Sequence, residues 1–120
     1  MTTDEKIRFV AIKACGAVVV NVEDWQEQIA VGVVYIHNGH AWVRREGTDN
    51  DTPFNPCSSL DDCAIAEKCI VRDAHEYRYY LALLAIVEKD SGKKMPLSKK
   101  ITATPMQRVD AMIRAHGGEP

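Results

Sequence analysis

Apolar side chains near the N-terminus recur at the spacing of one helix face, which predicts a helix over residues 3–15. The hydroxyl of Thr2 can cap the first turn, and Glu5 follows three residues later, as in a capping box. Gly16 stands where a left-handed residue ends many helices. The stripe expected to face the core consists of Ile7, Val10, Ala11 and Ala14.

Three β-branched runs then change the pattern and predict strands over residues 17–22, 29–36 and 40–45. Asn38-Gly39 separates the second run from the third, and both residues tolerate the positive φ of a two-residue hairpin turn. The sequence therefore predicts a meander of three strands. Its largest side chain, Trp42, is expected in the core.

The second half of the chain predicts two further helices. Residues 46–58 are polar and contain glycine and prolines, which indicates a loop. A helix over 60–71 follows the cap Ser59, with Asp61 and Asp62 at the positive end of its dipole. The last helix starts at Pro105 and ends before Gly117. Its signature consists of the cap Thr104, the prolyl N1 residue and a closing Gln107.

Residues 77–89 fit two interpretations. The Leu-Ala-Leu-Leu-Ala run favours helix, whereas the three tyrosines, Ile86 and Val87 favour a strand buried on both faces. We predict a strand here, with a helix as the alternative. Residues 90–100 are predicted to form a loop, and residues 101–103 to add an edge strand.

These elements together predict an α+β fold over residues 1–120 as a single domain. In this arrangement three helices pack on an antiparallel sheet of four to five strands, as a two-layer or sandwich structure in the order α-β-β-β-α-β-α. The formal net charge of −2 gives no global attraction to nucleic acid or to an anionic membrane. The acidic, polar N-terminus and the lack of a long apolar run predict a cytoplasmic protein whose cysteines are thiols.

Candidate chemistry is sparse, and we predict no catalytic residue, metal or cofactor. Cys57, Cys63 and Cys69 recur every six residues, which differs from the two-to-four-residue gaps of zinc sites and indicates small buried side chains. Cys57 precedes a helix N-terminus, where the dipole lowers a thiol pKa. His37 and His40 flank the hairpin turn and are interpreted as solvated, the alternative being a metal site with Glu46 or Asp49.

Two binding alternatives stay open. The N-terminus of the last helix is a candidate anion site through Thr104, Gln107 and Arg108, which predicts a small-molecule or nucleotide ligand, or a small enzyme. A cluster of lysines follows a tyrosine-rich segment, which is a pattern that suits single-stranded nucleic acid. The lysines are Lys93, Lys94, Lys99 and Lys100.

Three segments resemble the phage ABA sandwich domain, a family of small tailed-phage proteins of unknown function. They are the helix Asp4-Glu5-Lys6-Ile7 leading to Ala14-Cys15-Gly16, the Asn-Pro turn with its acidic pair and helix in 54–64, and the closing Ala-Thr-Pro-x-Gln-Arg helix in 101–115. The resemblance implies a fold and a phage origin, and it implies no activity.

From size, charge and this resemblance we predict a small non-catalytic phage or prophage accessory protein in an infected bacterial host. It is expected to bind a host protein, as inhibitors of nucleic-acid-guided antiviral nucleases do, with carboxylates imitating phosphates. Self-association is a further expectation, from Phe9, Ile12 and the sheet edges. The candidate partner-binding residues are Trp25, Glu46, Asp49, Asp51, Asp61 and Asp62.

Overall fold

Local capping signals in the sequence mark where the helices begin. The computed structural model describes residues 1–20, 30–45, 51–73, 75–92 and 103–120. Its elements are α1 (Thr3–Phe9), the π-helix η1 (Val10–Ala14), β1 (Val18–Val19), β2 (Val34–His37), β3 (His40–Val43), β4 (Thr52–Pro53), α2 (Leu60–Arg72), α3 (Glu76–Ser91) and α4 (Pro105–Ala115). The chain has the α+β fold that its sequence predicts.

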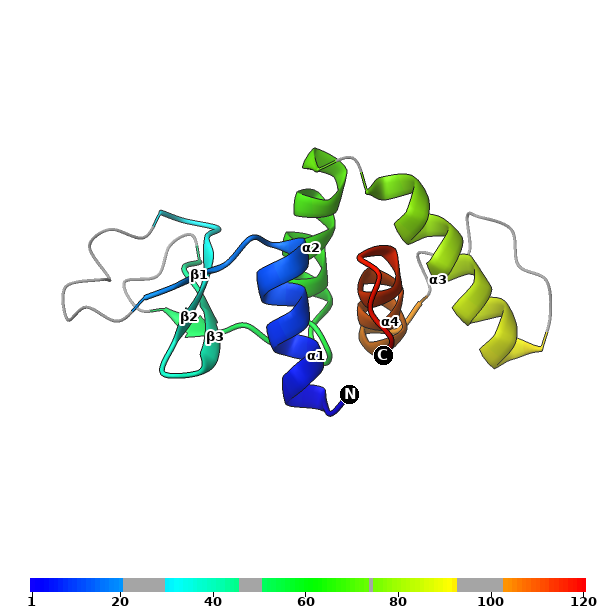
Figure 1. Ribbon diagram of the computed structural model, residues 1–120, viewed down its shortest axis with the longest axis horizontal. Coiled ribbons are helices and arrows are strands. Elements are labelled where there is room, and N and C mark those ends of the chain that lie inside the picture. Colours follow the sequence, from blue (N-terminus) through cyan, green and yellow to red (C-terminus); the bar gives the residue numbers. More distant parts are fainter. Residues whose placement is uncertain (21–29, 46–50, 74, 93–102) are drawn as a thin grey trace.

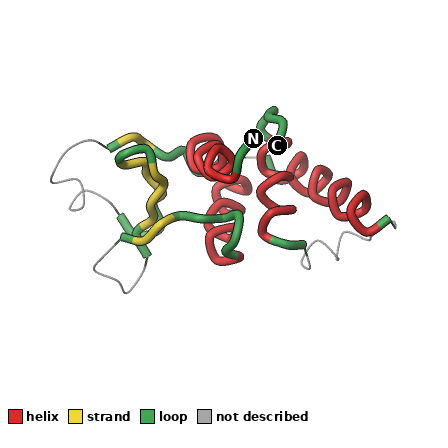
Figure 2. The backbone as a smooth tube through the Cα atoms, turned by 90° about the horizontal axis from the view of Figure 1, so that it is seen from below, coloured by secondary structure: helices red, strands yellow, loops and turns green. Residues whose placement is uncertain are grey.

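The elements follow one another along an elongated molecule of 50 × 28 × 24 Å. The sheet lies at one end, α1 and α2 come next, α4 lies beyond them, and α3 forms the other end (Figure 1). The same order is seen in the perpendicular view (Figure 2). The central helix α4 contacts α1, η1, α2 and α3, so it joins the two ends of the core.

The four strands form a sheet in the order β1-β2-β3-β4. The hairpin predicted at Asn38-Gly39 is confirmed: both residues have positive φ, 52° and 77°, and His37 faces His40 across the turn. The sheet is mixed rather than antiparallel throughout, because β1 runs parallel to β2. Strand β4 lies inside the segment predicted to be a loop, and its proline is tolerated because β4 is at the sheet edge.

The strand predicted over residues 77–89 is wrong, because this segment belongs to helix α3. Its buried side chains are spaced four, three and one residues apart, which is one face of a helix. That face packs mainly on α4. Gly92, with a φ of 71°, ends the helix in the left-handed conformation. The buried side chains of α3 are Tyr79, Leu83, Ile86 and Val87.

The predicted caps are confirmed in the structure. Oγ1 of Thr2 accepts from the Glu5 amide at 3.2 Å, and Oγ of Ser59 accepts from the Asp62 amide at 3.2 Å. Each hydroxyl satisfies an amide that has no partner within its own helix. The first helix continues to Ala14, one residue short of the predicted end, and its last five residues have the wider π geometry.

The core is contiguous from the sheet to α3. It contains the buried faces of η1, β2, β3 and all three later helices, and in α4 it includes Ala111 and Ala115. These small residues let neighbouring helices approach α4 closely. The edge strand predicted at residues 101–103 lies mostly outside the described residues, and Ala103 is buried outside any strand. In the described part of the chain no helix is both long and apolar enough to cross a bilayer.

Candidate functional site

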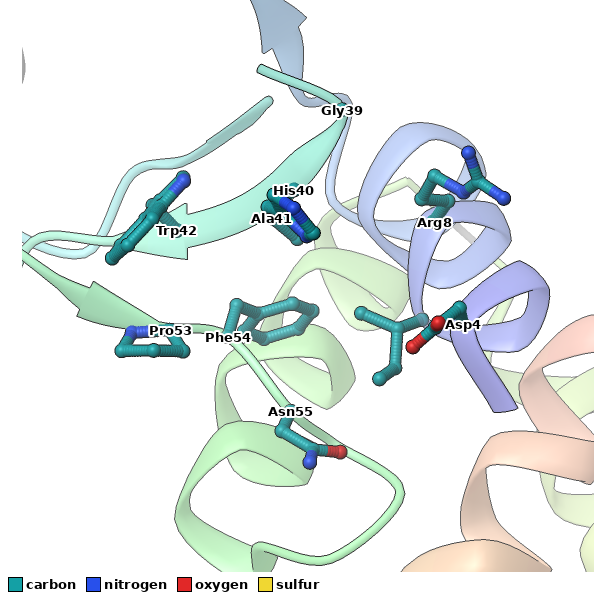
Figure 3. A pocket seen from close by; sticks show the side chains of 10 residues that line it. Asp4, Arg8, Gly39, His40, Ala41, Trp42, Pro53, Phe54 and Asn55 are labelled. Carbon is teal, nitrogen blue, oxygen red and sulfur yellow. The ribbon is translucent and has the colours of Figure 1, made fainter. Parts of the chain in front are cut away.

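A groove of about 530 Å³ lies between the first helix and the hairpin side of the sheet (Figure 3). Side chains from α1, from β3 and from β4 with the two residues after it converge on this groove. Half of the lining residues are solvent-exposed, so the groove is open along its length. The lining residues are Asp4, Ile7, Arg8, Gly39, His40, Ala41, Trp42, Pro53, Phe54 and Asn55.

The floor of the groove is apolar because strand pairing brings distant residues together. Trp42 faces Pro53 across the β3–β4 ladder, so the indole and the pyrrolidine ring lie side by side. The Trp42 indole N–H donates to the carbonyl of His37 at 3.4 Å, which fixes the ring over the hairpin. Phe54 is 2% exposed and lies in the middle of the floor. The sequence predicted Trp42 in the core, but its side chain is only partly buried here.

The rim of the groove carries charges of both signs. Asp4 and Arg8 lie one turn apart on α1, and both are exposed on the helix side of the groove. Within the described residues neither has an ion-pair partner. His40 is exposed on β3 between the helix and Trp42. The rim thus offers a carboxylate, a guanidinium and an imidazole to anything that enters.

Asn55 supplies a polar group whose hydrogen-bonding capacity is not used. Its main-chain N–H donates to Oδ2 of Asp62 at 2.8 Å, and its main-chain carbonyl accepts from the main-chain amides of Ser58 and Ser59. The side-chain Oδ1 is buried and has no hydrogen-bond partner among the described residues. An unsatisfied buried carbonyl oxygen costs about 1–3 kcal/mol, so turning the Asn55 side chain into the groove to accept an N–H from a bound molecule would recover part of that cost.

Asp62 holds this side of the groove in place. The carboxylate is 2% exposed at the N-terminus of α2, and Nη2 of Arg45 lies 2.6 Å from its Oδ1. With the bond to the Asn55 amide, Asp62 ties the end of β3 and the turn before α2 to the helix. The sequence placed Asp62 on a partner-binding surface. The structure places it inside, because its carboxylate is paired and also caps the helix dipole.

Asp51 is likewise an internal group, contrary to the partner-binding role proposed from the sequence. Its side chain is 2% exposed, with Arg44 Nε at 2.9 Å from Oδ1, and it accepts from the Tyr35 hydroxyl. Burial alone would raise the pKa of Asp51, but these hydrogen bonds and the Arg44 charge outweigh it and lower the pKa. Asp61 is exposed at the start of α2. Trp25, Glu46 and Asp49 lie outside the described residues.

The candidate anion site on α4 is occupied by its own cap. The Thr104 amide donates to Oε1 of Gln107 at 2.9 Å, and the Gln107 amide donates back to Oγ1 of Thr104 at 3.2 Å. Arg108 turns away to donate to the Ala103 carbonyl and to Glu67. The capping box therefore satisfies two of the amides that an anion would need, and it engages the expected cation elsewhere.

The remaining sequence candidates are placed as follows. His37 contacts the Val20 carbonyl through Nδ1 at 2.8 Å, and no group of three metal-ligating side chains exists among the described residues. The thiol pKa of Cys57 is raised by burial, contrary to the lowering expected from the helix dipole. The lysine cluster of residues 93–100 lies outside the described residues.

Sequence reasoning missed the groove almost completely. The sequence does not single out Asp4 or Arg8 as binding residues, His40 is interpreted as solvated, and Phe54 and Asn55 fall in a predicted loop. The Phe-Asn-Pro turn was a usable signal, because a buried aromatic beside a turn indicates packing against a distant element.

Comparisons of the chain with models of protein families, with curated proteins and with solved structures found no match in any of the three.

Proposed function

We propose that the protein acts by binding another protein, and that the groove between α1 and the β3–β4 edge is the binding surface. The partner presents an apolar side chain that enters between Trp42 and Phe54. The Asn55 side chain turns into the groove, and its Oδ1 accepts from a backbone N–H beside that apolar side chain. This observation of an open apolar floor next to an unsatisfied buried acceptor carries the proposal.

The form of the groove favours a macromolecular segment over an enclosed small ligand. Small-molecule sites bury most of their ligand's surface, whereas half of the residues here are exposed. Tryptophan and arginine are among the side chains most enriched in binding hot spots, and the groove has one of each, Trp42 on its floor and Arg8 on its rim. Asp4 beside Arg8 places opposite charges on the rim, and these charges set the orientation of a bound chain.

We further propose, from the phage-like segments of the sequence, that the partner is a protein of the bacterial host. A role in blunting an antiviral defence extends that proposal. The groove suits such a role because it recognises a short exposed segment and requires no chemistry. The acidic mimicry envisaged from the sequence now rests on Asp61 among the described candidates, since Asp51 and Asp62 are internal.

Affinity capture with tagged variants tests the groove. Bacterial lysate is passed over the wild type, Trp42→Ala and Arg8→Glu, and captured proteins are quantified by mass spectrometry. Truncating a central hot-spot residue costs about 2 kcal/mol or more, so the specific partner should fall by about thirtyfold with Trp42→Ala. Arg8→Glu is expected to reduce capture and to change its salt dependence.

Two exposed positions outside the groove provide matched controls. Tyr77→Ala removes an exposed aromatic from α3, and Lys68→Glu reverses an exposed charge on α2. Both should retain the partner that the groove variants lose. Equal capture by all five proteins, or recovery of a tightly held nucleotide in place of a protein, would contradict the proposal.

A further inference from the structure

Two cysteines that are far apart in sequence share a second, smaller cavity of about 270 Å³. Cys15 follows η1, and Cys69 lies on the last turns of α2. Both thiols are partly buried, and each lines the cavity together with Arg72. The other lining residues are Gly16, Val18, Gly32, Val33 and Val34.

The backbone explains why the two cysteines reach the same cavity. The Cys15 amide donates to the Val10 carbonyl at 3.1 Å, which closes the wide π turn, and Gly16 with a φ of 67° then turns the chain toward β1. On α2, six residues separate Cys63 from Cys69 and rotate them to different faces. The Cys63 thiol donates to the Pro56 carbonyl at 3.0 Å, whereas Cys69 lines the same cavity as Cys15.

The thiols of Cys15 and Cys69 differ in acidity. The hydrogen bond from Cys15 lowers the pKa of Cys69 to about 6; burial opposes this, and the Arg72 charge supports it. The same hydrogen bond, with burial, raises the pKa of Cys15, which therefore keeps the proton. Asp73, which pairs with Arg72 at 3.2 Å, opposes the lowering at Cys69 without cancelling it. These opposite shifts favour ionisation of Cys69 and protonation of Cys15.

We infer that Cys15 and Cys69 form a thiol–disulfide exchange site, at which a low-molecular-weight disulfide oxidises the two thiols to an intramolecular disulfide. The Cys69 thiolate attacks one sulfur of the oxidant, forms a mixed disulfide and releases the other half as a thiolate. In the mixed disulfide Cys69 no longer carries the charge that helps to raise the pKa of Cys15. Cys15 then attacks the Cys69 sulfur and displaces the second half, which leaves with the Cys15 proton as a thiol. Two electrons pass from the cysteines to the oxidant, which is reduced to one thiolate and one thiol.

The other two cysteines differ in the property that this reaction needs. Burial raises the thiol pKa of Cys57, and it raises that of Cys63 to about 12. Both therefore remain protonated at neutral pH, and a thiol is a poor nucleophile. Cys57 and Cys63 serve as internal controls within the same chain.

The experiment treats the full-length protein with oxidised glutathione at pH 7 and follows intact mass and peptide maps. The wild type should lose two hydrogens and yield a Cys15–Cys69 linked peptide. Cys15→Ser should stop at a glutathione adduct on Cys69, and Cys69→Ser should form no linked peptide. Cys57→Ser and Cys63→Ser should behave as the wild type.

A second comparison tests the hydrogen bond itself. Cys15→Ser keeps an O–H donor for the thiolate, whereas Cys15→Ala removes it, so adduct formation at pH 7 should be about tenfold slower in Cys15→Ala. If Cys69→Ser does not fold, brief alkylation of the wild type by iodoacetamide measures the order of thiol reactivity instead. Cys69 should be labelled first. Preferential reaction at Cys57 or Cys63, a stable Cys69 adduct in the wild type, or equal rates in the two Cys15 variants would overturn the inference.

Discussion

Two adjacent arginines at the end of β3 hold two different buried carboxylates. Consecutive side chains of an extended chain point to opposite sides, so Arg44 reaches Asp51 while Arg45 reaches Asp62. Tyr35 adds a hydroxyl to Asp51, and the Asn55 amide adds an N–H to Asp62. Asp51 thus gains hydrogen bonds from two residues, and Asp62 gains one hydrogen bond and an ion pair, which offset the cost of taking each charge out of water.

Acidification should reveal the contribution of Asp51. Its pKa in the folded protein is lowered from an ordinary value of 3.8. The stabilisation is therefore fully present above that value, and it is lost as the pH falls through the lower folded pKa. Urea unfolding should show that the free energy of unfolding of the wild type falls between pH 6 and pH 2. The decrease should be clearly smaller in Asp51→Asn.

Asp61→Asn is the matched control for this titration, because Asp61 is an exposed carboxyl at the start of α2. Its pH profile should run parallel to that of the wild type. If Asp51→Asn also ran parallel, the Arg44 pair would have no energetic role.

At the scale of elements, caps define the helix starts and side-chain faces define where the helices dock. The box at α4 is complete, with reciprocal bonds between Thr104 and Gln107, and Gln107 also donates to Asp90 on α3. Asp110, on the same helix, pairs with Lys6 of α1 at 2.7 Å, although Arg114 lies one turn later on α4 at a spacing that also permits an ion pair. A tertiary partner in a partly buried position displaces a local pair that would be exposed.

Removing the α4 cap should destabilise the whole protein, because α4 lies at its centre. Thr104→Ala loses the bond to the Gln107 amide, and such cap substitutions cost about 1 kcal/mol. Chemical denaturation should show this decrease in the free energy of unfolding. Thr3→Ala, at an exposed first-turn position of α1, should change it by less than about 0.5 kcal/mol.

At the scale of the whole molecule, Glu67 of α2 connects the three later helices. The Tyr79 hydroxyl on α3 donates to its Oε2 at 2.8 Å, and Nη1 of Arg108 on α4 donates to Oε1 at 3.1 Å. Burial of Tyr79, together with the charge of Glu67, raises the pKa of the phenol, so it stays a donor at all ordinary pH values. This triad fixes the register of α3, which contacts few other elements.

Glu67→Ala should cost about 2 kcal/mol of unfolding free energy, because it leaves Tyr79 and Arg108 without their shared acceptor. Tyr79→Phe should cost about 1 kcal/mol. The double variant should cost less than the sum, since both changes remove the same bond. Strict additivity would show that the triad does not act as a unit, and Glu119→Ala, at an exposed position, should be close to neutral.

The sequence by itself determined the features that depend on neighbours along the chain. The caps at Thr2, Ser59 and Thr104 and the Asn38-Gly39 turn are confirmed, because a cap or a tight turn involves residues no more than four apart. The α+β class followed from the same local patterns.

Only the tertiary structure decided what depends on contact between distant residues. Tyrosines and leucines in residues 77–89 suit helix and strand about equally, and packing against α4 selected the helix. The same holds for the burial of Asp51 and Asp62, the groove beside Trp42 and the meeting of Cys15 with Cys69. Local pattern carries no information about which arginine, ring or thiol a fold brings within reach, because those pairs form only when separate elements pack together.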